Sequence, residues 1–135
     1  MKSISQPRHC IQPRFRILCD GEIAFGPGKA ELLRHIEQTG SLREAAARMD
    51  ISYMRAWTLI KTMNQCFCEP LVNLSRGGPL GGGAVLTEAG HRALALYSKI
   101  ESASRRAAQA SWMRLERMLT RKKARPAARQ SRPPG

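Results

Sequence analysis

The chain has 135 residues, 42% of them hydrophobic, and a formal net charge of +13. This length suits one small domain with short appendages, and no apolar run is long enough to cross a bilayer. The first residues lack the apolar centre of a secretory signal, so we expect a soluble, cytoplasmic protein. The positive charge favours a polyanionic partner.

The positive charge is concentrated at the two ends of the chain. Residues 17–104 hold equal numbers of basic and acidic side chains. The surplus lies in an N-terminal arm (residues 1–13), in Arg14 and Arg16, and in the sequence from Arg105 onward. Residues 124–135 are rich in Arg, Pro and Ala, so we expect a disordered basic tail that adds nonspecific DNA contacts or serves solubility alone.

A short hairpin is predicted at the start of the folded part, over residues 14–25. Asp20-Gly21 is a two-residue turn signal between two short runs of β-prone residues. Phe15 and Ile17 alternate with Arg16 and Leu18, as in a half-buried strand. A helix should then begin near Lys29 and end at Thr39-Gly40, with one apolar face made of Leu32, Leu33 and Ile36.

The next segment, residues 41–64, predicts two helices joined by a tight turn. Ser41 is a suitable N-cap, and Glu44 can complete a capping box by reaching back to the Ser41 backbone N–H. Asp50 can adopt the left-handed conformation that ends a helix, and Ser52 can cap the second helix.

That second helix, residues 52–64, should have one buried and one exposed face. We expect it to bury Ala56, Trp57, Ile60 and Met63, and to direct Met54, Arg55, Thr58, Lys61 and Thr62 outward. Two capped helices with a polar and basic outer face are typical of a helix-turn-helix, although an ordinary helical hairpin is the alternative for this segment alone.

A second hairpin is predicted after the helix pair. Residues 71–75 and 84–87 are short alternating runs on either side of the glycine-rich loop at 76–83. Next to a helix-turn-helix this is a wing, whose backbone can approach phosphates because glycine lacks a Cβ. A nucleotide-binding loop is excluded because Ala84-Val85 stands where that motif needs Lys-Ser or Lys-Thr.

The last predicted element is a long helix capped by Thr87 and running from Glu88 to about Lys123. Its apolar residues recur mostly at spacings of three and four, over a length that exceeds what a small domain needs. We therefore expect residues 101–123 to form a dimer contact, unless the helix beyond Arg105 is solvated. The apolar positions are Ala93, Leu96, Tyr97, Ile100, Ala103, Ala107, Ala108, Trp112, Leu115, Met118 and Leu119.

Cysteine and histidine positions suggest no catalytic residues, no cofactor and no metal site. Cys66 and Cys68 are separated by one residue, whereas compact zinc sites favour at least two. The three histidines have no acidic partner at a telling spacing, so we do not expect an enzyme. A regulator that senses metal or redox state through its cysteines stays open as an alternative.

Several of these motifs together resemble the N-terminal domain of the ModE family. Members of that family are bacterial molybdate-responsive transcriptional regulators with a winged helix-turn-helix domain. The similarity covers roughly residues 16–100, and its Gly-Ser-Leu and Ala-Ala part is shared with LysR-type regulators. The resemblance implies DNA binding and a homodimer. It does not imply molybdate sensing, because we expect no room for a molybdate-binding domain before Gly135. The segments that carry it are Gly40-Ser41-Leu42, Ala45-Ala46, Ile51-Ser52-Tyr53, Ala56-Trp57, Met63-Asn64, Gly77-Gly78, residues 81–87 and Gly90.

We therefore expect a mainly α fold with a small β component: a winged helix-turn-helix over residues 14–100 with an N-terminal β-hairpin and a long C-terminal helix. The predicted function is a DNA-binding transcriptional regulator whose helix 52–64 reads the major groove of double-stranded DNA while the 76–83 wing contacts the backbone. Arg55 is the candidate for reading a guanine. A sequence-nonspecific nucleoid-associated protein is the alternative. The predicted DNA-binding residues are Ser52, Tyr53, Arg55, Thr58, Lys61, Arg76, Gly77 and Gly78.

Overall fold

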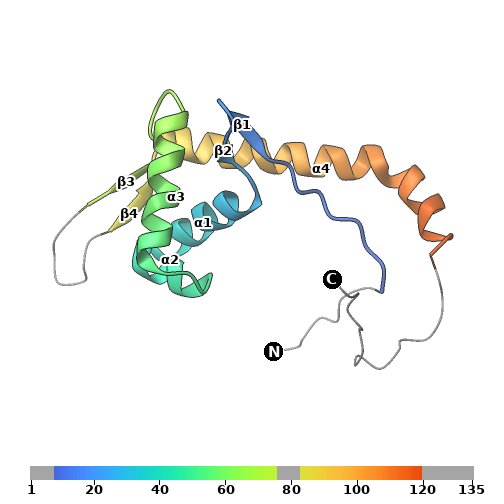
Figure 1. The fold of residues 1–135 in the computed structure, drawn as a ribbon, viewed down its shortest axis with the longest axis horizontal. Helices are drawn as coiled ribbons and strands as arrows, with labels where there is room; N and C mark the ends of the chain where they lie inside the picture. The colour runs from blue at the N-terminus through green and yellow to red at the C-terminus, as the bar shows by residue number, and fades with distance from the viewer. Residues whose placement is uncertain (1–7, 76–82, 120–135) are drawn as a thin grey trace, which may run out of the picture.

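The computed structural model describes residues 8–75 and 83–119 (Figure 1). The described part is mainly α with two small antiparallel strand pairs, which confirms the predicted fold class. The helices are α1 (Pro27–Thr39), α2 (Leu42–Arg48), α3 (Tyr53–Cys66) and α4 (Glu88–Glu116), and the strands are β1 (Ile17–Cys19), β2 (Glu22–Phe25), β3 (Val72–Leu74) and β4 (Ala84–Leu86). The predicted basic tail at 124–135 and the tip of the wing lie outside the described residues.

The core is built around α1, as its apolar spacing predicted. Leu32, Leu33 and Ile36 are at most 1% exposed, and α2 packs its small Ala45 and Ala46 side chains into the same cluster. Phe25 of β2 extends the cluster toward α4, with its ring centroid 5.1 Å from that of Tyr97 in an edge-on contact. This single core fixes where α3 and both hairpins stand.

The first hairpin turns where the sequence predicted, but its strands are shorter and more exposed. Asp20 and Gly21 have φ angles of 52° and 83°, the left-handed values that a tight two-residue hairpin turn requires. The ladder begins only at Ile17, with a register shift between Ile17 and Leu18. Phe15 and Ile17, which were expected on the buried side, are 39% and 40% exposed, so the expected half-buried alternation is wrong. The reason is that β1 pairs with β2 alone among the described strands and does not lie on the core.

The second hairpin is anchored at both ends to the helices around it. In β3–β4, Val72 pairs with Leu86 and Leu74 with Ala84, which confirms the predicted strand pair. The Ala84 N–H donates to the Gly40 carbonyl (3.1 Å), and the Thr87 N–H donates to the Leu71 carbonyl (2.9 Å). The wing is thereby fixed to the α1–α2 turn and to the start of α4.

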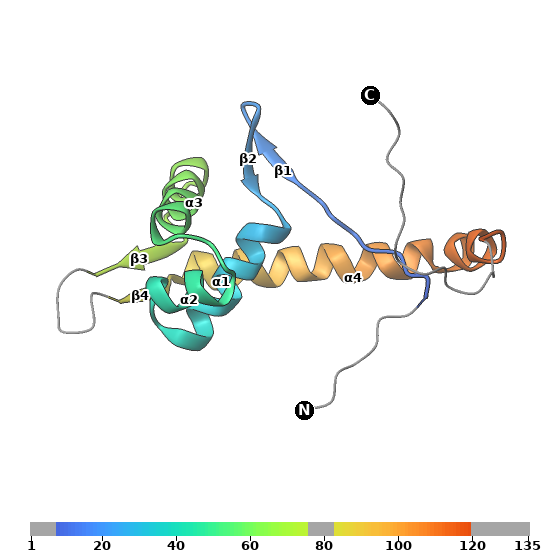
Figure 2. The ribbon, with the colours of Figure 1, turned by 60° about the horizontal axis from the view of Figure 1, so that its bottom comes forward.

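Helix α4 begins inside the domain and projects beyond it, with the N-terminal arm running alongside (Figure 2). Thr87 caps it as predicted, since its hydroxyl accepts from the Gly90 N–H. The predicted end at Lys123 is wrong: the helix ends at Glu116, and the Met118 and Leu119 N–H groups bond three residues back in a tightened last turn.

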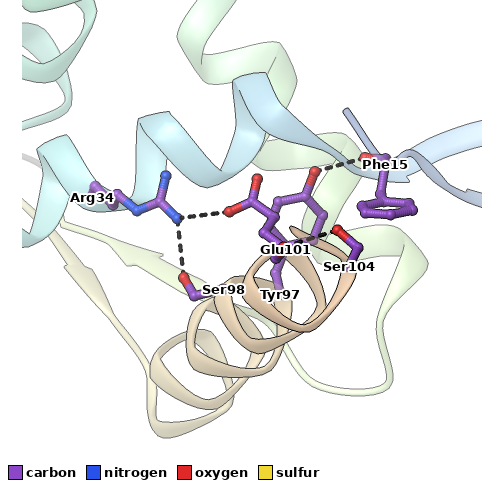
Figure 3. Close-up of polar contacts among 6 residues, drawn as sticks. All are labelled: Phe15, Arg34, Tyr97, Ser98, Glu101 and Ser104. Atoms are coloured by element: carbon purple, nitrogen blue, oxygen red, sulfur yellow. Dashed lines mark hydrogen bonds and ion pairs between the residues drawn. The ribbon is translucent and has the colours of Figure 1, made fainter. Parts of the chain in front are cut away.

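The middle of α4 is held by polar contacts from two other segments (Figure 3). The Tyr97 hydroxyl donates to the Phe15 carbonyl of the arm over 2.7 Å. Arg34 of α1 donates to the Ser98 hydroxyl (3.1 Å) and lies 3.8 Å from the Glu101 carboxylate. Arm, α1 and α4 are therefore tied together at one level of the molecule.

Candidate nucleic-acid interface

Helices α2 and α3 form the predicted helix-turn-helix, and each is capped by the expected serine. The Ser41 hydroxyl accepts from the Glu44 N–H (3.1 Å), and the Ser52 hydroxyl accepts from the Arg55 N–H (3.0 Å). The predicted capping box is only half formed. The Ser41 N–H donates to the Thr39 hydroxyl at 3.2 Å, so it does not need the Glu44 carboxylate.

The turn between these helices depends on one residue in a left-handed conformation. Asp50 has a φ of 59°, as predicted, and the chain reverses there so that the Ile51 N–H donates to the Ala46 carbonyl over 3.1 Å. A short polar residue tolerates this conformation better than a branched one. Ile51 then packs against the core, which fixes the angle at which α3 leaves the turn.

The first three turns of α3 expose a mixed polar and aromatic surface. Met54, Arg55, Thr58 and Lys61 are exposed, as the sequence predicted, and so is Tyr53, while Ala56, Ile60 and Met63 are buried. Thr62, which was also expected to point outward, is half-buried. The Thr58 hydroxyl donates to the Met54 carbonyl (3.0 Å) and keeps its acceptor lone pairs available. We call the exposed strip of α3 made by Met54, Thr58, Lys61 and Gln65 the outer face.

Trp57 was predicted to be buried, and this prediction is wrong. Its side chain is 37% exposed, and the Lys61 ammonium lies 5.1 Å from the centroid of its ring. Tyr53, one turn earlier on the same flank, lies under the Arg43 guanidinium of α2 at 5.1 Å. Trp57 stands on the edge of the buried face, where helical spacing alone leaves burial undecided. These two cation–π pairs add aromatic surface beside the outer face.

Arg55 lies on the opposite flank of α3, facing the β1–β2 hairpin. Together with Leu59 it lines a cavity of about 320 Å³ that Arg14 and Arg16 also line. The sequence did not predict that Arg14 and Arg16 lie near α3, because the local pattern of residues does not indicate where a separate hairpin docks.

The wing is described only up to its base. The Ser75 N–H donates to the Gly83 carbonyl (2.9 Å), and the Gly83 N–H donates back to the Ser75 carbonyl (3.1 Å). Of the predicted contact residues, Arg76, Gly77 and Gly78 lie outside the described residues. Of the other five, Ser52 caps α3, and Tyr53, Arg55, Thr58 and Lys61 lie on its first three turns, with Arg55 on the flank opposite Tyr53.

The cysteines form a pair that the sequence did not suggest. A side-chain hydrogen bond with Cys66, followed by the nearby Cys66 charge and by burial, raises the pKa of the Cys19 thiol.

Within residues 8–75 and 83–119, no three His, Cys, Asp or Glu side chains gather in a way that could hold a metal ion. Across the same residues, no helix is long and apolar enough to span a membrane.

Comparisons with known proteins find relatives that are similar in sequence. No protein-family model matches the chain. Azotobacter vinelandii molybdenum transport protein ModE is 40% identical over 88 residues, which is 65% of this chain and 33% of the relative. Escherichia coli DNA-binding transcriptional dual regulator ModE is 41% identical over 81 residues (60% and 31%), and Rhodobacter capsulatus molybdenum-pterin-binding protein MopB is 42% identical over 78 residues (58% and 29%). The chain thus spans about a third of the length of these relatives, and its resemblance to the N-terminal domain of ModE-type regulators is confirmed.

Proposed function

We propose that this protein binds double-stranded DNA and regulates transcription, with α3 in the major groove. The capped helix-turn-helix that presents an exposed, cationic α3 carries this proposal. It is supported by similarity to a protein named as a DNA-binding transcriptional dual regulator. Such a protein works in the bacterial cytoplasm, and we place it there. Molybdenum binding, which is part of the name of MopB, is not assigned to this chain, which covers only 29% of that relative.

The outer face of α3 is the surface we assign to base edges. Thr58 and Lys61 stand at its centre, and the Tyr53 ring and the Ser52 cap lie at the helix end that enters the groove first. Lys61 can donate to guanine, and the Thr58 methyl and hydroxyl groups can contact thymine or adenine. Arg76, Gly77 and Gly78 at the wing are assigned to the phosphate backbone, where a contact adds affinity without reading sequence.

Helix α4 supplies the surface for a second copy of the chain. Leu96, Ile100, Ala103 and Ala107 follow one another at spacings of four, three and four residues, and all four are exposed. Leu96 and Ile100 are 54% and 44% exposed. This spacing is that of a two-helix packing seam. A symmetric dimer would present two copies of α3 to half-sites about one helical turn apart.

Thr58→Ala and Lys61→Ala test whether α3 reads bases, and Arg76→Ala tests the wing. We expect each α3 substitution to relax the sequence preference at one base pair of a selected site, whereas Arg76→Ala should weaken binding to all sequences alike. Arg106→Ala, on an exposed position of α4, is the matched control for lost charge and should behave like the wild type. Affinities are measured by fluorescence anisotropy on a panel of single-base variants. If Thr58→Ala and Lys61→Ala both keep the wild-type preference, α3 is not the reading helix.

A separate test addresses the dimer. Ile100→Glu places a charge in the centre of the α4 seam and should convert the dimer to a monomer at micromolar concentration. Gln109→Glu adds the same charge to an exposed position on another face of the helix and should leave the dimer intact. Sedimentation equilibrium distinguishes the two states. A wild-type chain that is monomeric at all concentrations would disprove the dimer without affecting the α3 assignment.

A further inference from the structure

Three arginines from distant parts of the sequence meet around one cavity. It lies between the β1–β2 hairpin, the first turn of α1 and the hairpin-facing flank of α3. Arg14 and Arg16 come from the arm and hairpin, and Arg55 comes from α3. In Figures 1 and 2 the hairpin rises from the start of α1, and α3 lies to the left of it. The cavity, of about 320 Å³, is open to solvent and large enough for a phosphate group.

The three arginines of this cavity have no acidic partner in its wall. No Asp or Glu lines it, and within residues 8–75 and 83–119 the guanidinium groups of Arg14, Arg16 and Arg55 form no hydrogen bond or ion pair. Arg34 is different, because it bonds Ser98 and lies beside Glu101. Three unpaired guanidinium groups repel one another, and an anion between them would remove that cost.

The cavity also has donors in its wall. Lys29 lines it and is only 8% exposed, and its ammonium donates to the Ile23 carbonyl at 2.6 Å. Its remaining N–H donors have no partner among the described residues. Burial lowers the pKa of Lys29, and the Arg55 charge acts in the same direction, while the Cys66 and Glu22 charges oppose this shift. The same wall contains the first turn of α1, where no side chain caps the helix and no acidic residue is present, so the Gly28 and Lys29 amides lack helical acceptors.

We propose that this cavity is an oxyanion site, and that in the DNA complex it holds a backbone phosphate next to the groove occupied by α3. Guanidinium groups bind phosphate in a bidentate manner, and an uncapped helix N-terminus favours the same charge. The DNA part of this assignment rests on the proposed function. It gives Arg55 a role different from the one expected from sequence: it contacts a phosphate, together with Arg14 and Arg16, and does not read a guanine.

The first experiment compares DNA binding by two double variants. Arg14→Gln with Arg16→Gln removes two cations from the cavity, and Arg106→Gln with Arg117→Gln removes two exposed cations, one from the distal part of α4 and one from its C-cap. On a random-sequence duplex we expect the cavity variant to bind at least about tenfold more weakly than the control variant. When the logarithm of its DNA-binding constant is plotted against the logarithm of the salt concentration, the slope should be shallower by about 0.9. That difference corresponds to the loss of one phosphate contact. Equal binding by the two double variants would overturn the assignment to DNA.

Arg55→Gln distinguishes a phosphate contact from a base contact. If Arg55 contacts a phosphate, the substitution should reduce the binding affinity by a similar factor for every sequence on the panel of single-base variants. A loss confined to sites with one particular guanine would place Arg55 on a base edge and overturn its place in the cavity.

A titration with inorganic phosphate in the absence of DNA separates the two sources of the anion. We expect saturable shifts of the Gly28 and Lys29 amide resonances that disappear in the Arg14→Gln, Arg16→Gln variant. Saturable shifts together with unchanged DNA binding would make the occupant a free oxyanion and overturn the DNA part alone. No saturable shift and no DNA effect would overturn the site altogether. If the wild type binds no DNA, the proposed function fails, and this titration still decides the cavity.

Discussion

Gly90→Ala tests the tightest surroundings of any described glycine, where the first turn of α4 meets Leu71 just before the wing. A Cβ on Gly90 would lie 2.1 Å from the Leu71 carbonyl oxygen and 3.1 Å from its carbonyl carbon. Both are backbone atoms, and Leu71 is fully buried. The Leu71 carbonyl accepts from the Thr87 N–H (2.9 Å), and its N–H donates to Asn64 (2.8 Å), so the segment is held on both sides.

The expected cost follows from these contacts. Forcing a methyl group into a packed site costs about 1–3 kcal/mol, and the upper end applies because backbone must move. Separating Thr87 from Leu71 loses about 1 kcal/mol more, while the better helix propensity of alanine returns at most about 1 kcal/mol. We therefore expect the free energy of unfolding to fall by about 2–3 kcal/mol.

Urea unfolding followed by far-ultraviolet circular dichroism measures this difference, with all proteins at one concentration because a dimer links stability to concentration. The midpoint should fall by about 1 M or more, given usual urea slopes for a domain of this size. Gly28→Ala is the matched control, since a Cβ there meets nothing within 4 Å, and it should be neutral or slightly stabilising. An unchanged or higher midpoint for Gly90→Ala would refute the described approach of α4 to the wing.

Two further substitutions test how the arm and the wing are held. Tyr97→Phe removes the hydrogen bond to the Phe15 carbonyl and should lower the free energy of unfolding by about 1 kcal/mol. Burial raises the Tyr97 pKa above its usual 10.0. The free energy of unfolding of the wild type should therefore fall as the pH rises above 10.0, because the unfolded tyrosine loses its proton first. If the free energy of unfolding of Tyr97→Phe depended on pH in the same way, this explanation would be contradicted. Asn64→Ala removes bonds to the backbone of Leu71 and Val72 and should cost about 2 kcal/mol or more by urea unfolding, because buried backbone groups lose their partners. The exposed Asn73→Ala is its control, and equal midpoints would show that Asn64 does not hold the wing.

Features that depend on a few neighbouring residues were predictable from the sequence. The serine caps of α2 and α3, the threonine cap of α4 and the left-handed Asp50 all have short-range causes. The two strand pairs were also found, because glycine-containing turns separate short β-prone runs. These local signals were sufficient to identify a helix-turn-helix and the exposure of Arg55, Thr58 and Lys61 on α3.

Features that depend on how separate segments dock were not predictable. Trp57 lies at the edge of the buried face, where burial depends on neighbouring segments and not on the spacing within α3. The capping box on α2 failed because Thr39 supplies the acceptor first. Likewise, Arg14 and Arg16 reach Arg55 only because the β1–β2 hairpin stands beside α3, which periodicity within either segment does not encode.

Selection of bound sites from random duplex DNA at physiological salt is the most direct test of sequence reading by α3 in a dimer. It is run with the full chain and with a chain lacking residues 121–135. The account predicts that both proteins enrich the same palindromic site, with half-sites about one helical turn apart. If no sequence is enriched, and binding is lost with the last fifteen residues, the protein is a sequence-blind DNA binder that works through its basic end, and the assignment of α3 to the major groove is wrong.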